Sequence, residues 1–187
     1  MILAAVDRVV ELSASIDPQV VVRLRRIPEA RFRNRTRWNT ASDDGGTNWS
    51  DISGALPQRY VKAIAVDRNE PNIAWLAFSG YRTAHVYRTS DFGATWEAVS
   101  EGLPDIPVNA LLIDPSDRNI IYAGTDIGPF RYAEGRWEFI GAGMPPVVVT
   151  SFDVTANGRI VASTYGRGAY ELVVPRDSAP RRRSVRK

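Results

Sequence analysis

Five side chains in short Gly-containing stretches have groups that a polar ligand could bind: aromatic rings, guanidinium groups and a carboxylate. They are Tyr81, Arg82, Asp126, Tyr165 and Arg167. A few polar groups placed beside aromatic rings suit a polar or carbohydrate ligand. We therefore expect these residues to be the binding candidates, provided that the fold brings their loops to one end of the molecule.

The composition excludes several kinds of catalytic and metal site. The chain has no cysteine, so a disulfide framework, a thiolate zinc site and cysteine catalysis are excluded. One histidine, His85, cannot form a multi-histidine metal site. We expect His85 to be a strand residue with a local hydrogen bond, not an acid–base catalyst. No metal or other cofactor is predicted.

An internal repeat determines which fold the sequence predicts. Trp49 and Asp67 recur 47 residues later as Trp96 and Asp114, and Trp96 recurs 41 residues later as Trp137. Several further landmarks keep the same two offsets. Repeats of about 40–50 residues are typical of paired helices or of four-stranded propeller blades.

The segments within each repeat favour strands. They are short, rich in β-branched and aromatic residues, and separated by clusters of turn residues. One repeat is divided into expected strands at 61–66, 73–79, 84–90 and 95–99, joined as an antiparallel meander. The predicted fold is therefore all-β, with blades of four-stranded antiparallel meanders.

Successive turns of a meander alternate between the two ends of its sheet. The loops between the second and third strands of a blade thus share one end with the connections between blades. All five binding candidates lie in loops of this end, where ligands are commonly bound.

The turn before the fourth strand has the most specific motif in the chain. It reads Ser42-Asp43-Asp44-Gly45-Gly46-Thr47-Asn48-Trp49 and then Thr89-Ser90-Asp91-Phe92-Gly93-Ala94-Thr95-Trp96. Both copies resemble the Asp-box of BNR-repeat β-propellers, which include sialidases, sortilin-type receptor domains, xyloglucanase-type glycoside hydrolases and photosystem II assembly factors. A third copy, 131–137, lacks the Asp. The resemblance assigns structural roles to Ser42, Asp44, Gly46, Trp49, Thr89, Asp91, Gly93, Thr95 and Trp96.

Each position of this box has a physical role. The Asp carboxylate can accept hydrogen bonds from N–H groups of its own turn. Glycine supplies the positive φ that the chain reversal needs. The Trp can pack on a neighbouring strand or blade, so we expect Trp49, Trp96 and Trp137 to be mostly buried.

Asp126 is the one candidate for a catalytic residue. The stretch Ile121–Gly128 looks like the segment that contains a catalytic Asp in xyloglucanase-type hydrolases. Glycoside hydrolysis needs two carboxyl groups about 5–9.5 Å apart, and the chain shows no recognisable partner. A sialidase-like site would have a nucleophilic Tyr beside a cluster of arginines. Tyr165 and Arg167 alone do not provide such a cluster.

These observations favour a non-catalytic repeat module that binds a protein or a glycan. The alternative is a fragment of a carbohydrate-active glycoside hydrolase, xyloglucanase-like or sialidase-like. The first residues of the chain do not form a convincing secretory signal. Relatives of this type are often exported, so the sequence does not predict a cellular compartment. No apolar run is long enough to predict a membrane span.

Basic residues are concentrated in the two flanks. Residues 23–37 contain seven arginines against Glu29, and the tail contains six cations against Asp177. The middle, 38–174, is therefore acidic, which argues against nucleic acid as a partner. We divide the chain into an Arg-rich N-terminal segment, 1–37, irregular or partly stranded; the blades, 38–174; and a tail, 175–187, expected to be disordered.

Counting blades predicts three to four of them, fewer than in relatives of this type. We therefore expect an open arc, the C-terminal part of a larger propeller, with Ile2–Val6 and Gln19–Arg25 as possible additional strands. Exposed strand edges template pairing with other chains. The chain is thus expected to self-associate or to need missing N-terminal blades.

Overall fold

The structure is a computed structural model, and it describes residues 21–25, 38–42, 48 and 50–173. These residues form fourteen strands and no helix, grouped into four antiparallel sheets. No helix in the described part of the chain could cross a membrane. The predicted all-β meander is confirmed.

The two central sheets have four strands each, and we call them blade 2 and blade 3. Blade 2 contains β4 (Val61–Val66), β5 (Ala74–Phe78), β6 (Val86–Thr89) and β7 (Glu97–Ala98). Blade 3 contains β8 (Val108–Ile113), β9 (Ile121–Thr125), β10 (Gly128–Ala133) and β11 (Arg136–Phe139). In both, the strand order in the sheet follows the chain, as expected for a meander.

The two outer sheets have three strands each among the described residues. Blade 1 contains β1 (Val21–Arg25), β2 (Trp38–Ser42) and β3 (Ser50–Asp51). Blade 4 contains β12 (Val149–Val154), β13 (Ile160–Thr164) and β14 (Ala169–Glu171). β1 lies within the segment expected at Gln19–Arg25, whereas Ile2–Val6 and the tail from 175 lie outside the described residues.

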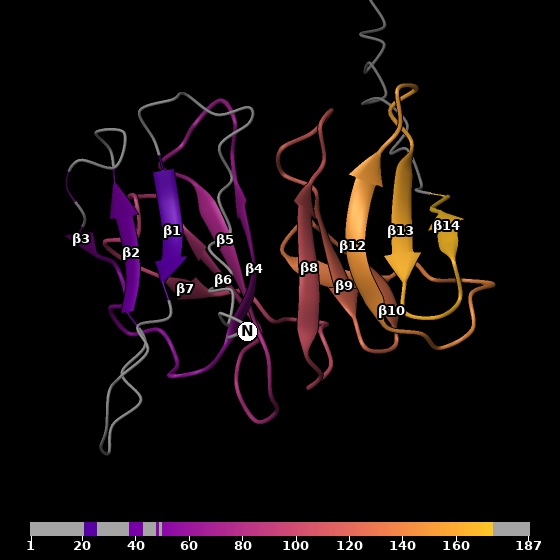
Figure 1. The fold of residues 1–187 in the computed structure, drawn as a ribbon, viewed down its shortest axis with the longest axis horizontal. Coiled ribbons are helices and arrows are strands. Elements are labelled where there is room, and N and C mark those ends of the chain that lie inside the picture. The colour runs from indigo at the N-terminus through magenta and orange to yellow at the C-terminus, as the bar shows by residue number, and fades with distance from the viewer. Residues whose placement is uncertain (1–20, 26–37, 43–47, 49, 174–187) are drawn as a thin grey trace, which may run out of the picture.

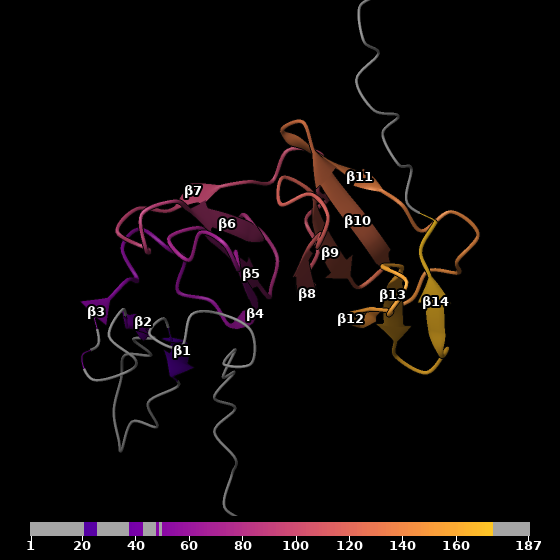
Figure 2. The same ribbon diagram turned by 90° about the horizontal axis from the view of Figure 1, so that it is seen from above.

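The blades stand side by side as an open arc (Figure 1), and the view from above shows the sheets fanned around an open side (Figure 2). The first strands of consecutive blades are neighbours: β4 lies beside β8, and β8 beside β12. The expected open arc of about four blades is therefore what the described residues form.

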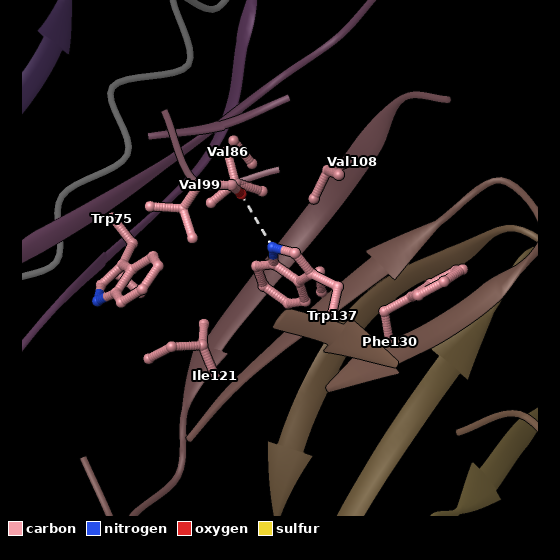
Figure 3. Packing of buried hydrophobic residues seen from close by; sticks show 10 residues of the cluster. Trp75, Val86, Val99, Val108, Ile121, Phe130 and Trp137 are labelled. Atoms are coloured by element: carbon pink, nitrogen blue, oxygen red, sulfur yellow. Dashed lines mark hydrogen bonds between the residues drawn. The ribbon is translucent and has the colours of Figure 1, made fainter. Parts of the chain in front are cut away.

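The core lies between blades because both faces of a central blade are buried. In β5 the side chains alternate: Trp75 and Ala77 join the cluster shared with blade 3, whereas Leu76 and Phe78 belong to the cluster on the other face. All five residues of β5 are buried, and so are all five of β9. Figure 3 shows the cluster between blades 2 and 3, in which Trp137 packs among aliphatic side chains.

The face of each blade that points toward the next blade becomes polar in blade 4. We call it the forward face. In blades 2 and 3 this face is covered by the following blade. The cross-strand pairs at the same place on it are Ala65–Trp75 in blade 2, Leu112–Tyr122 in blade 3 and Asp153–Val161 in blade 4.

The tryptophan expectation is confirmed for Trp137 and only partly for Trp96. Trp137 is 1% exposed, whereas Trp96 is half-buried, and Trp49 lies outside the described residues. The innermost strands are partly wet as expected: Val154 of β12 is 40% exposed.

Candidate functional site

The five predicted binding residues lie in loops at one end of the arc. In Figure 1, β12 runs upward and β13 downward, so the loop from β13 to β14 is at the lower end. Tyr81 and Tyr165 are 57% and 78% exposed, and the neighbouring Arg82 and Arg167 are exposed as well. These four side chains are thus accessible from solvent.

Asp126 differs from the other four because it is half-buried and held by a neighbour. Its Oδ1 accepts a hydrogen bond from Asn109 Nδ2 at 2.8 Å. Asn109 belongs to β8, the innermost strand of the same blade. The bond ties the short turn between β9 and β10 to that innermost strand.

Two further exposed apolar side chains at this end were not singled out from the sequence. Ile127, beside Asp126 in the turn of blade 3, is 41% exposed, and Tyr60, just before β4, is 46% exposed. Each of the loops between second and third strands in blades 2, 3 and 4 thus has one exposed aromatic or aliphatic side chain: Tyr81, Ile127 and Tyr165. An isolated exposed Ile or Tyr has no sequence signal of its own, and the topology alone shows that they share an end.

Asp105 connects the loop between blades 2 and 3 to blade 2. Its Oδ1 accepts the Arg82 backbone N–H at 2.7 Å and lies 2.9 Å from His85 Nε2. The hydrogen bond with His85, followed by that from the Arg82 backbone, lowers the pKa of the Asp105 carboxyl below its usual value. Asp105 has no signal in the sequence, because its partners Arg82 and His85 are 23 and 20 residues away.

His85 is a buried residue with a partner distant in sequence. It precedes β6, is 2% exposed, and contacts Asp105, 20 residues away. The expected hydrogen bond is present, but it joins two loops and is not local. The second ring nitrogen, Nδ1, is buried and has no hydrogen-bond partner among the described residues.

The opposite end of the arc contains the turn at 89–96, the second copy of the box motif seen in the sequence. Asp91 Oδ1 accepts the Thr95 backbone N–H at 2.9 Å, and Oδ2 accepts the Thr95 hydroxyl at 2.6 Å. Thr89 Oγ1 accepts the Gly93 N–H at 2.9 Å and donates to Asp91 Oδ1 at 2.7 Å. Hydrogen bonds from Thr95, first of all the one from its hydroxyl, lower the pKa of Asp91 to about 2.

This geometry confirms the predicted backbone hydrogen bond for Asp91. Gly93 has φ +86°, and a Cβ there would meet Ile52 Cβ at 2.8 Å, so the turn also packs closely on blade 1. Ser42 is the last residue of β2, whereas Asp44, Gly46 and Trp49 of the first box lie outside the described residues.

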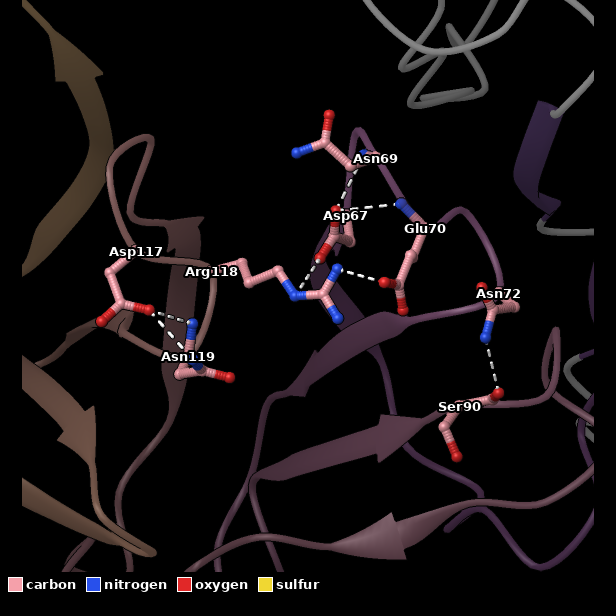
Figure 4. A network of polar contacts seen from close by, with 8 residues as sticks. All are labelled: Asp67, Asn69, Glu70, Asn72, Ser90, Asp117, Arg118 and Asn119. Atoms are coloured by element: carbon pink, nitrogen blue, oxygen red, sulfur yellow. Dashed lines mark hydrogen bonds and ion pairs between the residues drawn. The ribbon is translucent and has the colours of Figure 1, made fainter.

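The turns between first and second strands lie at the same end and are joined across blades (Figure 4). Asp67 Oδ1 accepts the N–H groups of Asn69 and Glu70 at 2.8 and 3.1 Å. Arg118 of blade 3 bonds to Glu70 and lies 3.8 Å from Asp67 Oδ2. The Arg118 guanidinium holds the pKa of the Glu70 carboxyl below its usual value.

A cavity of about 490 Å³ opens between blades 2 and 3 at this same end. Its lining includes Trp75, Arg88, Glu97, Arg118 and Tyr132. None of the five predicted binding residues contributes to it. In the described part of the chain, no three acidic, histidine or cysteine residues are grouped so that they could hold a metal ion.

Comparison with known proteins identifies the fold. No protein-family model and no curated sequence matches the chain. Among solved structures, the extracellular domain of a hybrid two-component system protein from B. thetaiotaomicron is similar, with a TM-score of 0.61 and 15% identity over 82% of this chain and 19% of that chain. The GH74 xyloglucanase from Xanthomonas campestris has a TM-score of 0.57 and 16% identity over 79% and 25%.

A third neighbour, YCF48 bound to D1 peptide, has a TM-score of 0.54 and 14% identity over 89% of this chain and 57% of that chain. The fold is an open β-propeller. The chain spans less than two thirds of the length of each of these neighbours. At such identities the likeness concerns the fold alone.

Proposed function

We propose that this chain is a non-catalytic β-propeller module that binds a protein or glycan ligand through the loops between the second and third strands of its blades. The observation that carries the proposal is the exposure of Tyr81, Ile127 and Tyr165 at one end. Large side chains held at the tips of short loops by a rigid scaffold are suited to ligand contact. Arg82 and Arg167 add positive charge beside the two tyrosines.

The environment of Asp126 supports a structural role for this carboxylate. One of its oxygens is bonded to Asn109 at 2.8 Å, and the side chain is half-buried. An Asp that fixes a turn in this way stabilises the loop that presents Ile127. Asp126 is thus proposed to shape the binding end without taking part in a reaction.

The alternative function is that of a glycoside hydrolase fragment, with Asp126 as a catalytic residue. It is favoured by the similarity of Ile121–Gly128 to a xyloglucanase-type segment and by GH74 enzymes among the structural neighbours. Two carboxyl groups about 5–9.5 Å apart would be required. We keep this function as the second candidate.

A binding experiment tests the first proposal. The full chain, the variant Tyr81→Ala/Tyr165→Ala and the control Phe92→Asn are applied to peptide and glycan arrays. Phe92 is 49% exposed in the Asp-box turn at the opposite end, and its φ of 58° suits Asn. Ligands retained by the control and lost by the double variant support the proposal; ligands retained by both variants contradict it.

A hydrolysis assay separates the two functions. The chain and its Asp126→Asn variant are incubated with xyloglucan and with a sialoside. We expect no turnover by either protein. Turnover that the substitution abolishes would establish the hydrolase and overturn our preference.

A further inference from the structure

The fourth strand of blade 3, β11, contacts blade 2 through Trp137. Trp137 Nε1 donates to the Val99 carbonyl at 2.9 Å, drawn as the dashed line in Figure 3. The Trp137 backbone N–H donates to the Glu101 carbonyl at 2.8 Å. A Cβ on Gly102, which has φ +83°, would overlap the main-chain oxygen of Trp137. This strand thus contacts blade 2 at three places: the Val99 carbonyl, the Glu101 carbonyl and Gly102.

Blade 2 makes the same indole contact with blade 1. Trp96 Nε1 donates to the Ile52 carbonyl at 2.8 Å. Ile52 and Val99 are 47 residues apart, as are Trp49 and Trp96 in the repeat. The contact between a tryptophan and the preceding blade is therefore a repeated feature of this chain.

In blade 3, residues 140–144 have the same backbone hydrogen bonds as residues 99–103 of blade 2. Ile140 N–H bonds to the Pro129 carbonyl at 3.0 Å, as Val99 N–H bonds to Val86 at 2.9 Å. Met144 N–H bonds to the Gly141 carbonyl at 2.9 Å, as the Leu103 N–H bonds to Ser100 at 3.0 Å.

Gly143 is the blade 3 equivalent of Gly102, since the two glycines are 41 residues apart and share φ +83°. However, a Cβ on Gly143 would meet nothing within 4 Å. Among the described residues, the place that Trp137 takes against blade 2 is thus open against blade 3.

The edge of blade 4 beside this place is also open among the described residues. Blade 4 ends at β14, where blades 2 and 3 have a fourth strand. Leu172 N–H bonds to the Ile160 carbonyl at 2.8 Å, and Glu171 faces Val161 in the register. Because neighbouring residues of a strand alternate in direction, the N–H and C=O of Glu171 point away from β13. In the described part of the chain, they face no further strand.

We propose that this position receives an extended strand of a second protein, with a tryptophan that binds the Ile140 carbonyl. The fourth strands of this chain share the pattern Trp-x-x-Val/Ile, at Trp96 to Val99 and Trp137 to Ile140. Residues 174–187 contain no tryptophan, so this segment does not supply the indole. Addition of a strand to a sheet edge is a common mode of peptide recognition, in which pockets for side chains give specificity.

A peptide with the sequence of residues 134–142, EGRWEFIGA, is the probe, titrated into the full-length chain by calorimetry. We expect binding with one peptide per chain. A peptide with Ala in place of Trp should bind about tenfold more weakly or worse, since buried tryptophans dominate such contacts. Absence of binding, or equal affinity of both peptides, overturns the proposal.

Two glycine variants locate the probe. Gly143→Ala places a methyl group where the incoming main chain would lie, and Gly158→Ala is the matched control, with φ +72° and nothing within 4 Å of its Cβ position. We expect the first variant to weaken peptide binding at least about tenfold and the second to leave it unchanged, with thermal unfolding confirming that both are folded. Equal affinity of the two variants would place the peptide elsewhere and overturn the proposal.

This proposal is independent of the ligand-binding end. The Tyr81→Ala/Tyr165→Ala variant should bind the probe as the unaltered chain does. Loss of probe binding in that variant contradicts a site at the blade 4 edge, whatever the arrays show.

Discussion

At the scale of single residues, Asp91 has the most complete set of hydrogen bonds in the turn at 89–96. Its two oxygens accept from the Thr95 backbone, the Thr95 hydroxyl and the Thr89 hydroxyl. All of these bonds favour the ionised carboxylate, which is why its pKa falls from 3.8 to about 2. The hydrogen bonds that hold this turn therefore depend on the negative charge of the Asp91 carboxylate.

A pH dependence follows from this shift. Because the folded pKa of Asp91 lies below the unfolded one, its contribution to stability is complete above about pH 4 and is lost as the pH falls to about 2. We expect Asp91→Asn to lose less of its melting temperature over this window than the unaltered chain. Thermal unfolding at successive pH values measures the difference.

The control for this experiment is Asp153→Asn, which removes an exposed carboxylate of β12 on the polar forward face of blade 4. Its melting temperature should follow that of the unaltered chain as the pH falls. Parallel profiles for Asp91→Asn and the unaltered chain would contradict the assigned role of Asp91.

At the scale of elements, the same turn has different surroundings in successive blades. The turns at Gly102 and Gly143 have the same φ and equivalent backbone hydrogen bonds. One is covered by the main chain of Trp137, and the other faces open space in the described structure. The local conformation comes from the sequence of the turn, whereas the packing depends on the neighbouring strand.

This pair of turns provides a stability prediction. Gly143→Ala should cost about 1–2 kcal/mol, from the left-handed backbone alone. Gly102→Ala adds an overlap with the Trp137 carbonyl and should cost about 2–5 kcal/mol. Urea unfolding midpoints measure the loss of stability in both variants. Equal losses would show that the Trp137 main chain does not crowd Gly102.

At the scale of the whole molecule, the open arc determines which surfaces can associate. The forward face of blade 4 is polar, with Asp153 where blade 3 has Leu112. Polar outer faces are typical of terminal repeats, which meet water instead of another repeat. The innermost strands are less well covered: β8 has two buried residues of six, whereas all five residues of β9 are buried.

We therefore expect the full chain to self-associate through its open inner side and not through the blade 4 face. Sedimentation velocity should show a sedimentation coefficient that rises with concentration. Ser163→Glu, on the forward face of blade 4, should leave that rise unchanged. A compact monomer at all concentrations would contradict the prediction of self-association.

The sequence by itself determined the features that depend on neighbours along the chain. The repeat offsets predicted the blades, the alternation of turns predicted which loops share an end, and the box motif predicted the bonds of Asp91. These features are readable because their contacts span four residues or fewer, or repeat at a constant interval. The strand expected at 61–66 has those limits in the structure, and the other limits of this blade differ by one to two residues, as for 84–90 against Val86–Thr89.

Only the tertiary structure decided the features that depend on contacts between blades. Trp96 and Trp137 occupy equivalent positions, yet one is half-buried and the other 1% exposed, because burial is set by the neighbouring blade. The pair of His85 and Asp105, and the contact of Arg118 with Glu70, join residues 20 and 48 positions apart. Such pairs have no local signal, since each partner is an ordinary polar residue until the arc brings the two together.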